Sequence, residues 1–427
     1  MNAPSVEKEI GIEVYATKSQ GIDGKLRQFP EDFRVEETLT NGSTAKIEPT
    51  NIPSITGHGR YLICVLVKRK IDIFQAVQTV ANKLNIATER IQTGGIKDTN
   101  ALTAQHISIS RMLPEQATQI KTDKVWLYPL QYSNEKISSS LLWGNKFQIN
   151  VRAIGDPKTT VHHHLSQTCQ ELLEMGGCPN FFGHQRFGTN RAITHLVGKH
   201  ILAGEWEQAA LTFLAKPTMQ ERPETRQVRQ QLWNTQNYED ALHCFPTRLV
   251  YERYMLRHLA RQRRDFLGAF HRLPRKLCQL FVQAYQSYLF NRFLSQRMVH
   301  GLSLKTPRTH DYKVNVNGEE RAALPLIGYR QGFSGEQQGE IEKTILEKEN
   351  VTQNMFRIPL MPIISSSGGL RVALAPIIEL SVGELSEDEE NVGKKMVSLS
   401  FVLRKGSYAT VVLREFMKPK DPAEAGF

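Results

Sequence analysis

The chain has 427 residues, which is enough for about two to three domains of ~150 residues each. Hydrophobic residues make up 40% and charged residues 23% of it, a globular balance that excludes a disordered or fibrous protein. The 54 lysines and arginines outnumber the 43 aspartates and glutamates, so the formal net charge is +11 and a polyanionic partner such as nucleic acid is favoured.

Cysteine usage and hydropathy indicate the compartment. The five cysteines include no CxxC pair and are too few for a disulfide framework, so we expect reduced thiols and a cytoplasmic location. The N-terminal segment lacks the basic-then-apolar layout of a signal peptide, and no apolar run approaches the ~20 residues that cross a bilayer. We therefore expect no membrane partner.

Two strands and a helix are predicted first along the chain. Residues 33–38 and 61–67 are rich in β-branched and aromatic residues and are bounded by proline or glycine, which is typical of strands. Residues 71–86 carry apolar residues, Phe74 among them, at spacings of three and four, and Asp72 is placed to cap the start. This pattern predicts a helix whose apolar face packs on a sheet.

The middle of the chain is predicted to be mostly helical. Residues 161–174 form an expected helix that ends at Gly176. Residues 250–298 combine long helical periodicity with many arginines, which indicates an all-helical region. The charged residues 334–349 predict a surface helix, and the acidic residues 385–391 predict a solvated loop.

The C-terminal part returns to strand character. Residues 397–403 and 408–416 flank a turn at 404–407, which predicts a β-hairpin. Strands near both ends and helices between them predict an α+β fold. The simplest architecture is one sheet domain built from both ends of the chain, with a mostly helical insertion from about 191 to 367.

Several common chemistries lack their motifs. The sequence has no GxxxxGK[ST], no strand-linked GxGxxG and no GxSxG, so it does not indicate nucleotide hydrolysis, dinucleotide redox chemistry or a serine nucleophile. The only histidine cluster, residues 162–164, would point its side chains about 100° apart on a helix and lacks paired cysteines or HExxH nearby. We therefore expect no metal site.

Three segments place polar, charged and aromatic residues beside turn glycines, where folded chains hold sites more often than cores. They are residues 93–105, 180–188 and 406–410. In the second, aromatic rings alternate with amide and cationic groups, a composition suited to stacking on a base and reading its edge. Spacing alone leaves Asp98 as a turn aspartate, and it leaves Phe181 and Phe187 as equally suitable core residues.

Taken together, six segments resemble the TruD family of pseudouridine synthases, and the resemblance spans nearly the whole chain. In chain order the segments are PEDFRVEE (30–37), GIKDTNALTAQ (95–105), NFFGHQRFG (180–188), QAYQSYLFNRF (283–293), LPLIGY (324–329) and GSYATVVLREF (406–416). The parts that resemble the family least are 200–250 and 300–367.

The resemblance implies a fold and an activity. It implies a pseudouridine-synthase-type catalytic domain with a mixed, mostly antiparallel sheet, made of residues 1–190 and 368–427. It also implies a mostly helical, RNA-contacting TRUD insertion domain at 191–367. The implied enzyme is an isomerase that converts uridine to pseudouridine in tRNA, expected at position 13, with no metal or organic cofactor. A monomer is the default expectation.

The resemblance also assigns the catalytic residues. Asp98 matches the family's catalytic aspartate, a nucleophile towards C1′ of the ribose or C6 of the uracil. Arg27 matches a basic residue that pairs with this aspartate, and a guanidinium can hold a carboxylate through a planar fork. Lys97 is a closer neighbour in sequence, but adjacent residues of an extended chain point to opposite faces. Lys97 is therefore the second candidate for the charge partner.

Phe33, Asn180 and Tyr408 match family positions that hold the target nucleotide. Phe182, which matches a position where other pseudouridine synthase families have a tyrosine, is the fourth expected substrate-binding residue. Rings can stack on a base, contributing ~1–3 kcal/mol each, and an amide can donate to and accept from uracil's edge. Tyr408 stands where phenylalanine is common in the family. Because Phe182 has no hydroxyl group, the base that removes the C5 proton is not identified. Gln185 and Arg186 are expected to brace the loop or contact phosphate, and Arg414 and Glu415 to form a structural ion pair.

Other readings remain open on the sequence. An RNA-binding or RNA-chaperone module would keep the pocket without the reaction, a glycosidase would release the free base, and the same isomerase could act on a different RNA. Arg253, Arg257 and Arg261 fall four residues apart, so they form either a track for RNA phosphates or a solvated helix face.

Overall fold

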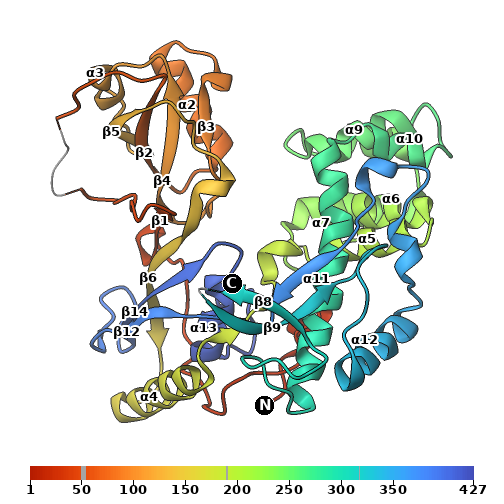
Figure 1. Cartoon of the computed structure of the whole chain (residues 1–427). Helices are drawn as coiled ribbons and strands as arrows, with labels where there is room; N and C mark the ends of the chain where they lie inside the picture. The colour runs from red at the N-terminus through yellow and green to blue at the C-terminus, as the bar shows by residue number, and fades with distance from the viewer. Residues whose placement is uncertain (50–53, 189–190, 317) are drawn as a thin grey trace.

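The computed structural model describes residues 1–49, 54–188, 191–316 and 318–427, and its largest element is a nine-stranded sheet (Figure 1). The strand order is β12-β14-β6-β1-β4-β2-β5, with β13 beside β14 and β3 beside β4. The strands are β1 Phe33–Leu39, β2 Tyr61–Arg69, β3 Ile91–Thr93, β4 Leu102–Ser110, β5 Val125–Ser133, β6 Leu142–Ile154, β12 Ile378–Val382, β13 Ser386–Glu387 and β14 Lys395–Arg404. The two strands predicted first are confirmed as β1 and β2.

This sheet is mixed and mostly antiparallel, as expected. β1 and β4 are parallel, with Arg34 opposite Leu102, and every other described strand pair in the sheet is antiparallel. β14 pairs with β6, with Leu399 opposite Ile149. Strands from distant parts of the chain therefore share one sheet, which confirms the predicted α+β class.

Helix α2 (Ile73–Leu84) forms where the periodicity predicts it. The carboxylate of Asp72 accepts hydrogen bonds from the backbone N–H groups of Phe74 and Gln75, which caps the first turn. Ile73 and Val80 are buried against the core between α2 and the sheet. Phe74, expected on this buried face, is instead 72% exposed, because it lies in the first turn beyond the edge of the packed stripe.

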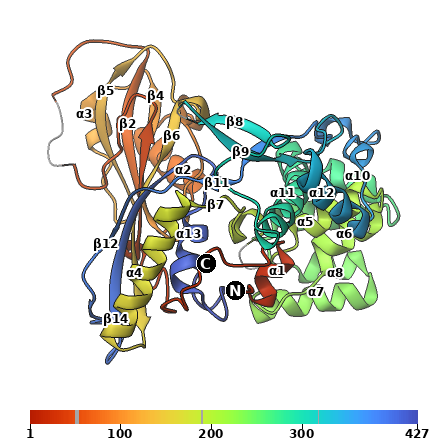
Figure 2. The ribbon, with the colours of Figure 1, turned by 60° about the horizontal axis from the view of Figure 1, so that its bottom comes forward.

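Helix α4 (Lys158–Met175) also matches its prediction and ends at Gly176, which adopts φ +81°. That left-handed conformation suits a glycine helix cap. The buried face of α4 includes Val161 and Leu165, which belong to the same hydrophobic core as Val411 of the C-terminal helix. The two helices contact each other, and their buried residues share this core with Leu399 and Phe401 of β14 (Figure 2).

The predicted C-terminal hairpin is wrong in its second half. β14 confirms the first strand, but the following segment is helix α13 (Ala409–Met417), with Tyr408 at its start. All nine residues of α13 are buried, so no polar face reveals the helical period, and Thr410, Val411 and Val412 give the segment a strand-like composition. Packing against α4 and the sheet overrides this local preference.

Most of the other helices, from α5 to α12, lie in the middle of the chain and confirm the helical prediction there. In the described residues they are α1 Ser5–Glu9, α3 Pro114–Thr118, α5 Thr194–Leu202, α6 Trp206–Ala215, α7 Pro223–Thr235, α8 Tyr238–Cys244, α9 Val250–Leu259, α10 Phe266–His271, α11 Arg275–Val299 and α12 Glu336–Glu349. Short 3₁₀ helices are η1 Pro30–Asp32, η2 Thr88–Arg90, η3 Ser139–Leu141, η4 His184–Arg186, η5 Gln353–Phe356 and η6 Pro362–Ile364. Figure 1 shows α5, α6, α7, α9, α10 and α11 grouped together, apart from the β2–β5 end of the sheet.

Two charged segments expected in solvent are partly buried. In α12, Glu342 is 0% exposed and its carboxylate accepts hydrogen bonds from the backbone and hydroxyl groups of Ser334, each at 2.8 Å. In the acidic loop, Asp388 is 3% exposed and lies 3.0 Å from the guanidinium of Arg152. Buried carboxylates need such donors, and the sequence pattern does not show where the donors lie.

Two small sheets lie next to the helices. β8 (Tyr312–Val316), β9 (Glu319–Leu326) and β10 (Gly369–Val372) form one, and β7 (Cys178–Pro179) pairs with β11 (Leu374–Ala375) to form the other. One hydrophobic core runs from the sheet face of β6 and β14 to α11. None of the helices in the described part of the chain has the length and apolar character needed to span a bilayer.

Candidate active site

Asp98 lies in the loop between β3 and β4, at the end of the sheet where β1 begins. Its side chain is 20% exposed and borders a cavity of about 630 Å³. Other lining residues come from distant stretches of the chain: Arg27, Gln185, Ala423, Gly426 and Phe427. The fold therefore brings the N-terminal segment, the 180–188 loop and the C-terminal segment to one carboxylate.

Arg27 lies beside Asp98, with its Nη2 atom 3.4 Å from Oδ1 of the carboxylate. The guanidinium carbon lies 4.0 Å from the ring centroid of Phe33, and Nη1 donates to the backbone carbonyl of Gly426 at 2.5 Å. Burial lowers the pKa of Arg27, and the neighbouring Asp98 charge opposes that shift. The guanidinium is thus held in place on three sides.

Phe33 was expected to hold the nucleotide, but the structure places it under Arg27. The ring is 1% exposed, and its edge packs against Phe147, with a centroid distance of 6.3 Å. A base has no open ring face to stack on here. Phe33 therefore contacts the guanidinium of Arg27 and not the open cavity.

Gln185 contacts the catalytic candidate directly, since its side-chain amide donates a hydrogen bond to Oδ1 of Asp98. Arg27 donates to the same oxygen. In the described residues Oδ2 of Asp98 accepts no hydrogen bond. One carboxylate oxygen is thus anchored and the other is available to react.

Lys97 points away from Asp98. Its ammonium lies 2.7 Å from Oε2 of Glu37 on β1 and 2.7 Å from Oδ1 of Asn145 on β6. Burial alone would raise the pKa of Glu37, but hydrogen bonds from His106 and the charge of Lys97 lower it. Arg27, not Lys97, is the cation next to the Asp98 carboxylate.

Lys68, on β2, is a site residue that sequence reasoning missed. Its side chain is 0% exposed, and its ammonium donates to the backbone carbonyls of Asp98 and Ile71, the latter at 3.0 Å. Burial lowers the pKa of Lys68 to about 8. A lysine at the end of an apolar strand is more often solvated, so only its inward orientation reveals that it holds the Asp98 loop.

Asn180 belongs to a second cluster, which Arg371 of β10 holds together. Arg371 donates to the backbone carbonyl of Asn180 at 2.9 Å and to its Oδ1 at 2.7 Å, and to the carbonyl of Gly406 at 2.8 Å. The Asn180 amide group donates to the carbonyl of Val372 at 3.1 Å. Asn180 is 5% exposed, so its amide is mainly occupied by the protein.

Phe182 and Tyr408 lie in the same cluster. Their ring centroids are 6.1 Å apart, and the Arg371 guanidinium carbon lies 4.1 Å from the Phe182 centroid. Phe182 is 9% exposed, whereas Tyr408 is half-buried, and burial raises the pKa of Tyr408. Arg186 braces this loop on α11, because its Nε donates to the hydroxyl of Ser287 at 3.0 Å.

The predicted site residues therefore form two groups. Arg27 and Gln185 contact Asp98 directly, with Phe33 behind Arg27. Asn180, Phe182 and Tyr408 surround Arg371, which carried no sequence signal beyond its position after a glycine pair. None of the four expected nucleotide-binding residues lines the Asp98 cavity in the described chain.

The arginines that were expected to form either a phosphate track or a solvated helix face do not share one face of α9. Arg253 turns inward, where Nη1 donates to the carbonyls of Leu242 and Phe245, each at 2.7 Å. Helix α9 ends at Leu259, so Arg261 lies beyond it.

The described residues contain no group of three or more His, Cys, Asp or Glu side chains placed to hold a metal ion.

Comparison with known proteins yields relatives along nearly the whole chain. The family model described as tRNA pseudouridine synthase D (TruD) matches residues 9–323 and 313–416. A probable tRNA pseudouridine synthase D from Methanosarcina acetivorans is 38% identical over 445 residues, covering 98% of each chain. One from Methanopyrus kandleri is 35% identical and covers 93% of this chain and 95% of its own length.

A solved structure also matches. The crystal structure of the putative tRNA pseudouridine synthase D from Methanosarcina mazei superposes with a TM-score of 0.81 at 36% identity. The match covers 98% of this chain and 99% of the other. Sequence and fold therefore point to the same relatives.

Proposed function

The chain belongs to the tRNA pseudouridine synthase D family, and from this premise we propose that it is an isomerase that converts uridine to pseudouridine in tRNA. The observation that carries the proposal is the Asp98 carboxylate, which borders a cavity of about 630 Å³ and has only its Oδ1 atom hydrogen-bonded, to Arg27 and Gln185, within the described residues. Position 13 of tRNA is the proposed target.

The reaction needs an ionised carboxylate in a fixed position. The C1′–N1 bond breaks, the C1′–C5 bond forms, C5 loses a proton and N1 gains one, so the atoms balance without a co-reactant. We therefore propose that no metal or organic cofactor takes part. Oδ2 of Asp98 attacks either C1′ or C6, which divides one difficult step into two easier ones.

The surrounding residues position this carboxylate. Arg27 keeps a positive charge beside Asp98, and Phe33 fixes the plane of the Arg27 guanidinium. Lys68 holds the backbone carbonyl of Asp98. Such preorganisation matters because a misplacement of about 1 Å can cost ~10²-fold in rate.

The second cluster is proposed to hold the flipped nucleotide. Tyr408 is the more exposed ring of the pair with Phe182, so it offers the surface on which a base can stack. Asn180 retains one N–H that the described residues do not use, which could donate to a uracil carbonyl. Extruding the nucleotide costs a few kcal/mol, which these contacts offset.

The wider organisation follows from the same proposal. Residues 1–190 and 368–427 would form the catalytic domain, and 191–367 the inserted domain that contacts RNA. The enzyme is proposed to act as a cytoplasmic monomer. An excess of positive charge supports binding to RNA phosphates.

The test is Asp98→Asn, which keeps the size of the side chain and removes its charge. We expect RNA binding without pseudouridine, measured by nucleotide-resolved mapping of tRNA incubated with each protein. Asp156→Asn is the matched control, because Asp156 is an exposed aspartate outside the cavity. Full activity of Asp98→Asn would eliminate the mechanism.

The same assay separates the alternatives. Pseudouridine in another RNA would change the target and keep the reaction. Free uracil would indicate a glycosidase, and RNA binding by the parent protein without any product would favour the chaperone reading.

A further inference from the structure

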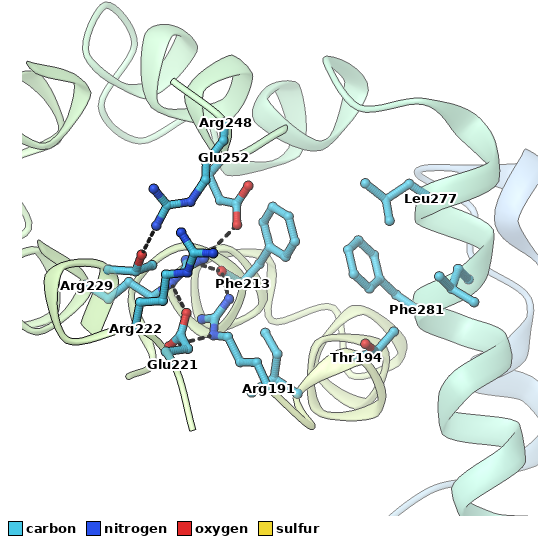
Figure 3. Close-up of a pocket in the computed structure, with 13 residues that line it drawn as sticks. Arg191, Thr194, Phe213, Glu221, Arg222, Arg229, Arg248, Glu252, Leu277 and Phe281 are labelled. Carbon is cyan, nitrogen blue, oxygen red and sulfur yellow. Dashed lines mark hydrogen bonds and ion pairs between the residues drawn. The ribbon is translucent and has the colours of Figure 1, made fainter. Parts of the chain in front are cut away.

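A second cavity, of about 350 Å³, lies in the helical region between α6, α7 and α11, and no step of the proposed reaction uses it. Figure 3 shows arginine side chains gathered on one side of it and Leu277 and Phe281, from α11, on the opposite side. Its volume is at the lower end of sites that hold small molecules, which span ~300–1,000 Å³.

The inner charges of this cavity are balanced. Arg229 lies 2.8 Å from Oε1 of Glu221 and 2.7 Å from Oε1 of Glu252. Arg191 lies 3.6 Å from Oε2 of Glu221, and its guanidinium also donates to the carbonyl of Phe213 at 2.7 Å. These two arginines are satisfied by the protein, so they form a rigid polar floor and do not need a ligand.

The outer arginines are different. Arg222 and Arg248 are exposed, and neither forms an ion pair with a carboxylate in the described residues. The guanidinium of Arg248 donates to the neutral hydroxyl of Thr225 at 2.7 Å, which fixes its position without cancelling its charge. The mouth of the cavity therefore carries two uncompensated positive charges, the arrangement that binds phosphate.

The opposite wall is apolar. Leu277 and Leu280 are half-buried and present hydrocarbon to the cavity, with Phe281 behind them at 2% exposure. A ligand that contacts both the arginines and the apolar wall needs an anionic group and a flat apolar group a few ångströms apart. A nucleotide has both, in its phosphate and its base.

This cavity and the Asp98 cavity each share lining residues with a third, smaller cavity. Arg191 and Ile193 line both the arginine-lined cavity and this neighbouring cavity of about 100 Å³. That neighbour shares Ala423 and Phe427 with the Asp98 cavity. The shared residues make the three cavities neighbours, so a strand with one nucleotide at Asp98 would continue past the smallest cavity towards Arg222.

We propose that this cavity binds a second nucleotide of the substrate RNA, with its phosphate on Arg222 and Arg248 and its base against Leu277 and Leu280. RNA is proposed as the ligand, in preference to a free nucleotide, because this inference rests on the proposed function. It adds a contact that selects the RNA by the shape of the strand flanking the target uridine.

The test compares two double variants with equal charge changes. Arg222→Glu/Arg248→Glu reverses the mouth of the cavity, and Arg263→Glu/Arg264→Glu reverses two exposed arginines outside it. Binding of the substrate tRNA is measured from low to high salt on the Asp98→Asn background. Because turnover is not needed, failure of the proposed reaction and failure of this site are distinguishable.

The first variant is expected to weaken binding about tenfold more than the control. Its plot of log affinity against log salt should be shallower by about 0.7, the value for one phosphate of a single strand. When the same double variant carries the native Asp98, its kcat at saturating tRNA should be unchanged, because the lost contact stabilises the bound substrate and the transition state equally. Equal losses in both variants would overturn the proposal.

A second readout identifies the ligand. Leu277→p-benzoylphenylalanine should photo-crosslink to one nucleotide near the target uridine, and absence of a crosslink would count against the site. Uridine monophosphate and inorganic phosphate are titrated as free probes. Binding of either at micromolar concentration, abolished by Arg222→Glu/Arg248→Glu, would replace the RNA assignment with a free-nucleotide site.

Discussion

The buried charge network around Arg414 should make the protein sensitive to acid. Arg414, on α13, lies 2.6 Å from Oε2 of Glu7 and 2.5 Å from Oε1 of Glu415, which confirms the expected pair with Glu415. The other carboxylate oxygen of Glu415 accepts hydrogen bonds from the backbone N–H groups of Ala16 and Thr17, at 3.0 Å each. The network ties the N-terminal segment that carries Arg27 to the helix that follows Tyr408.

The size of the effect follows from the pKa of Glu7. Burial alone would raise that pKa, but Arg414 and His184 lower it from its ordinary 4.5 to about 2. Since one pKa unit is ~1.4 kcal/mol, the ionised carboxylate contributes about 3 kcal/mol at neutral pH. Breaking a buried ion pair by removing one partner typically costs a similar ~3–5 kcal/mol.

The sign of the pH dependence follows. The folded pKa lies below the unfolded one, so this stability is present above pH 4.5 and is lost as the pH falls from 4.5 towards 2. We expect Glu7→Gln to lower the free energy of unfolding by about 3 kcal/mol at pH 7 and by about 1 kcal/mol at pH 3. Glu9→Gln, an exposed change in the same helix, should stay within ~0.5 kcal/mol at both.

The assay is urea unfolding of the three proteins at both pH values, followed by circular dichroism and by tryptophan fluorescence. Coincident transitions would justify a two-state treatment. A Glu7→Gln effect below 1 kcal/mol at pH 7, or one of equal size at both pH values, would refute the reasoning.

Two further predictions concern the positioning of Asp98. Arg27→Lys keeps the charge but loses the planar contact with Phe33. We therefore expect kcat to fall ~10–100-fold while tRNA affinity changes less than twofold. Unchanged single-turnover rates would contradict this expectation. Lys68→Met removes the donor to the Asp98 carbonyl and should lower kcat ~10–100-fold, as measured by single-turnover pseudouridine formation. Lys83→Met, on the exposed face of α2, is its control, and equal rates for the two variants would remove Lys68 from the site.

The pair Asp98 and Arg27 shows how much of the candidate site the family motifs predict. The match to family motifs pointed to Asp98 and Arg27, and the structure brings them within 3.4 Å although 71 positions separate them. Spacing alone left Asp98 as a turn aspartate. Lys68 and Arg371 could not be found this way, because their importance lies in the backbone carbonyls they contact, and those contacts leave no pattern in the chain.

Local chemistry by itself determined the elements that have one buried and one exposed face. Strand β1 alternates between buried and half-buried residues, and α2 has a capping aspartate and an apolar stripe. Tertiary packing decided α13, where every residue is buried and the helical period is hidden. It also decided which charge faces Asp98, because the direction of a side chain depends on the partners that the fold brings to it.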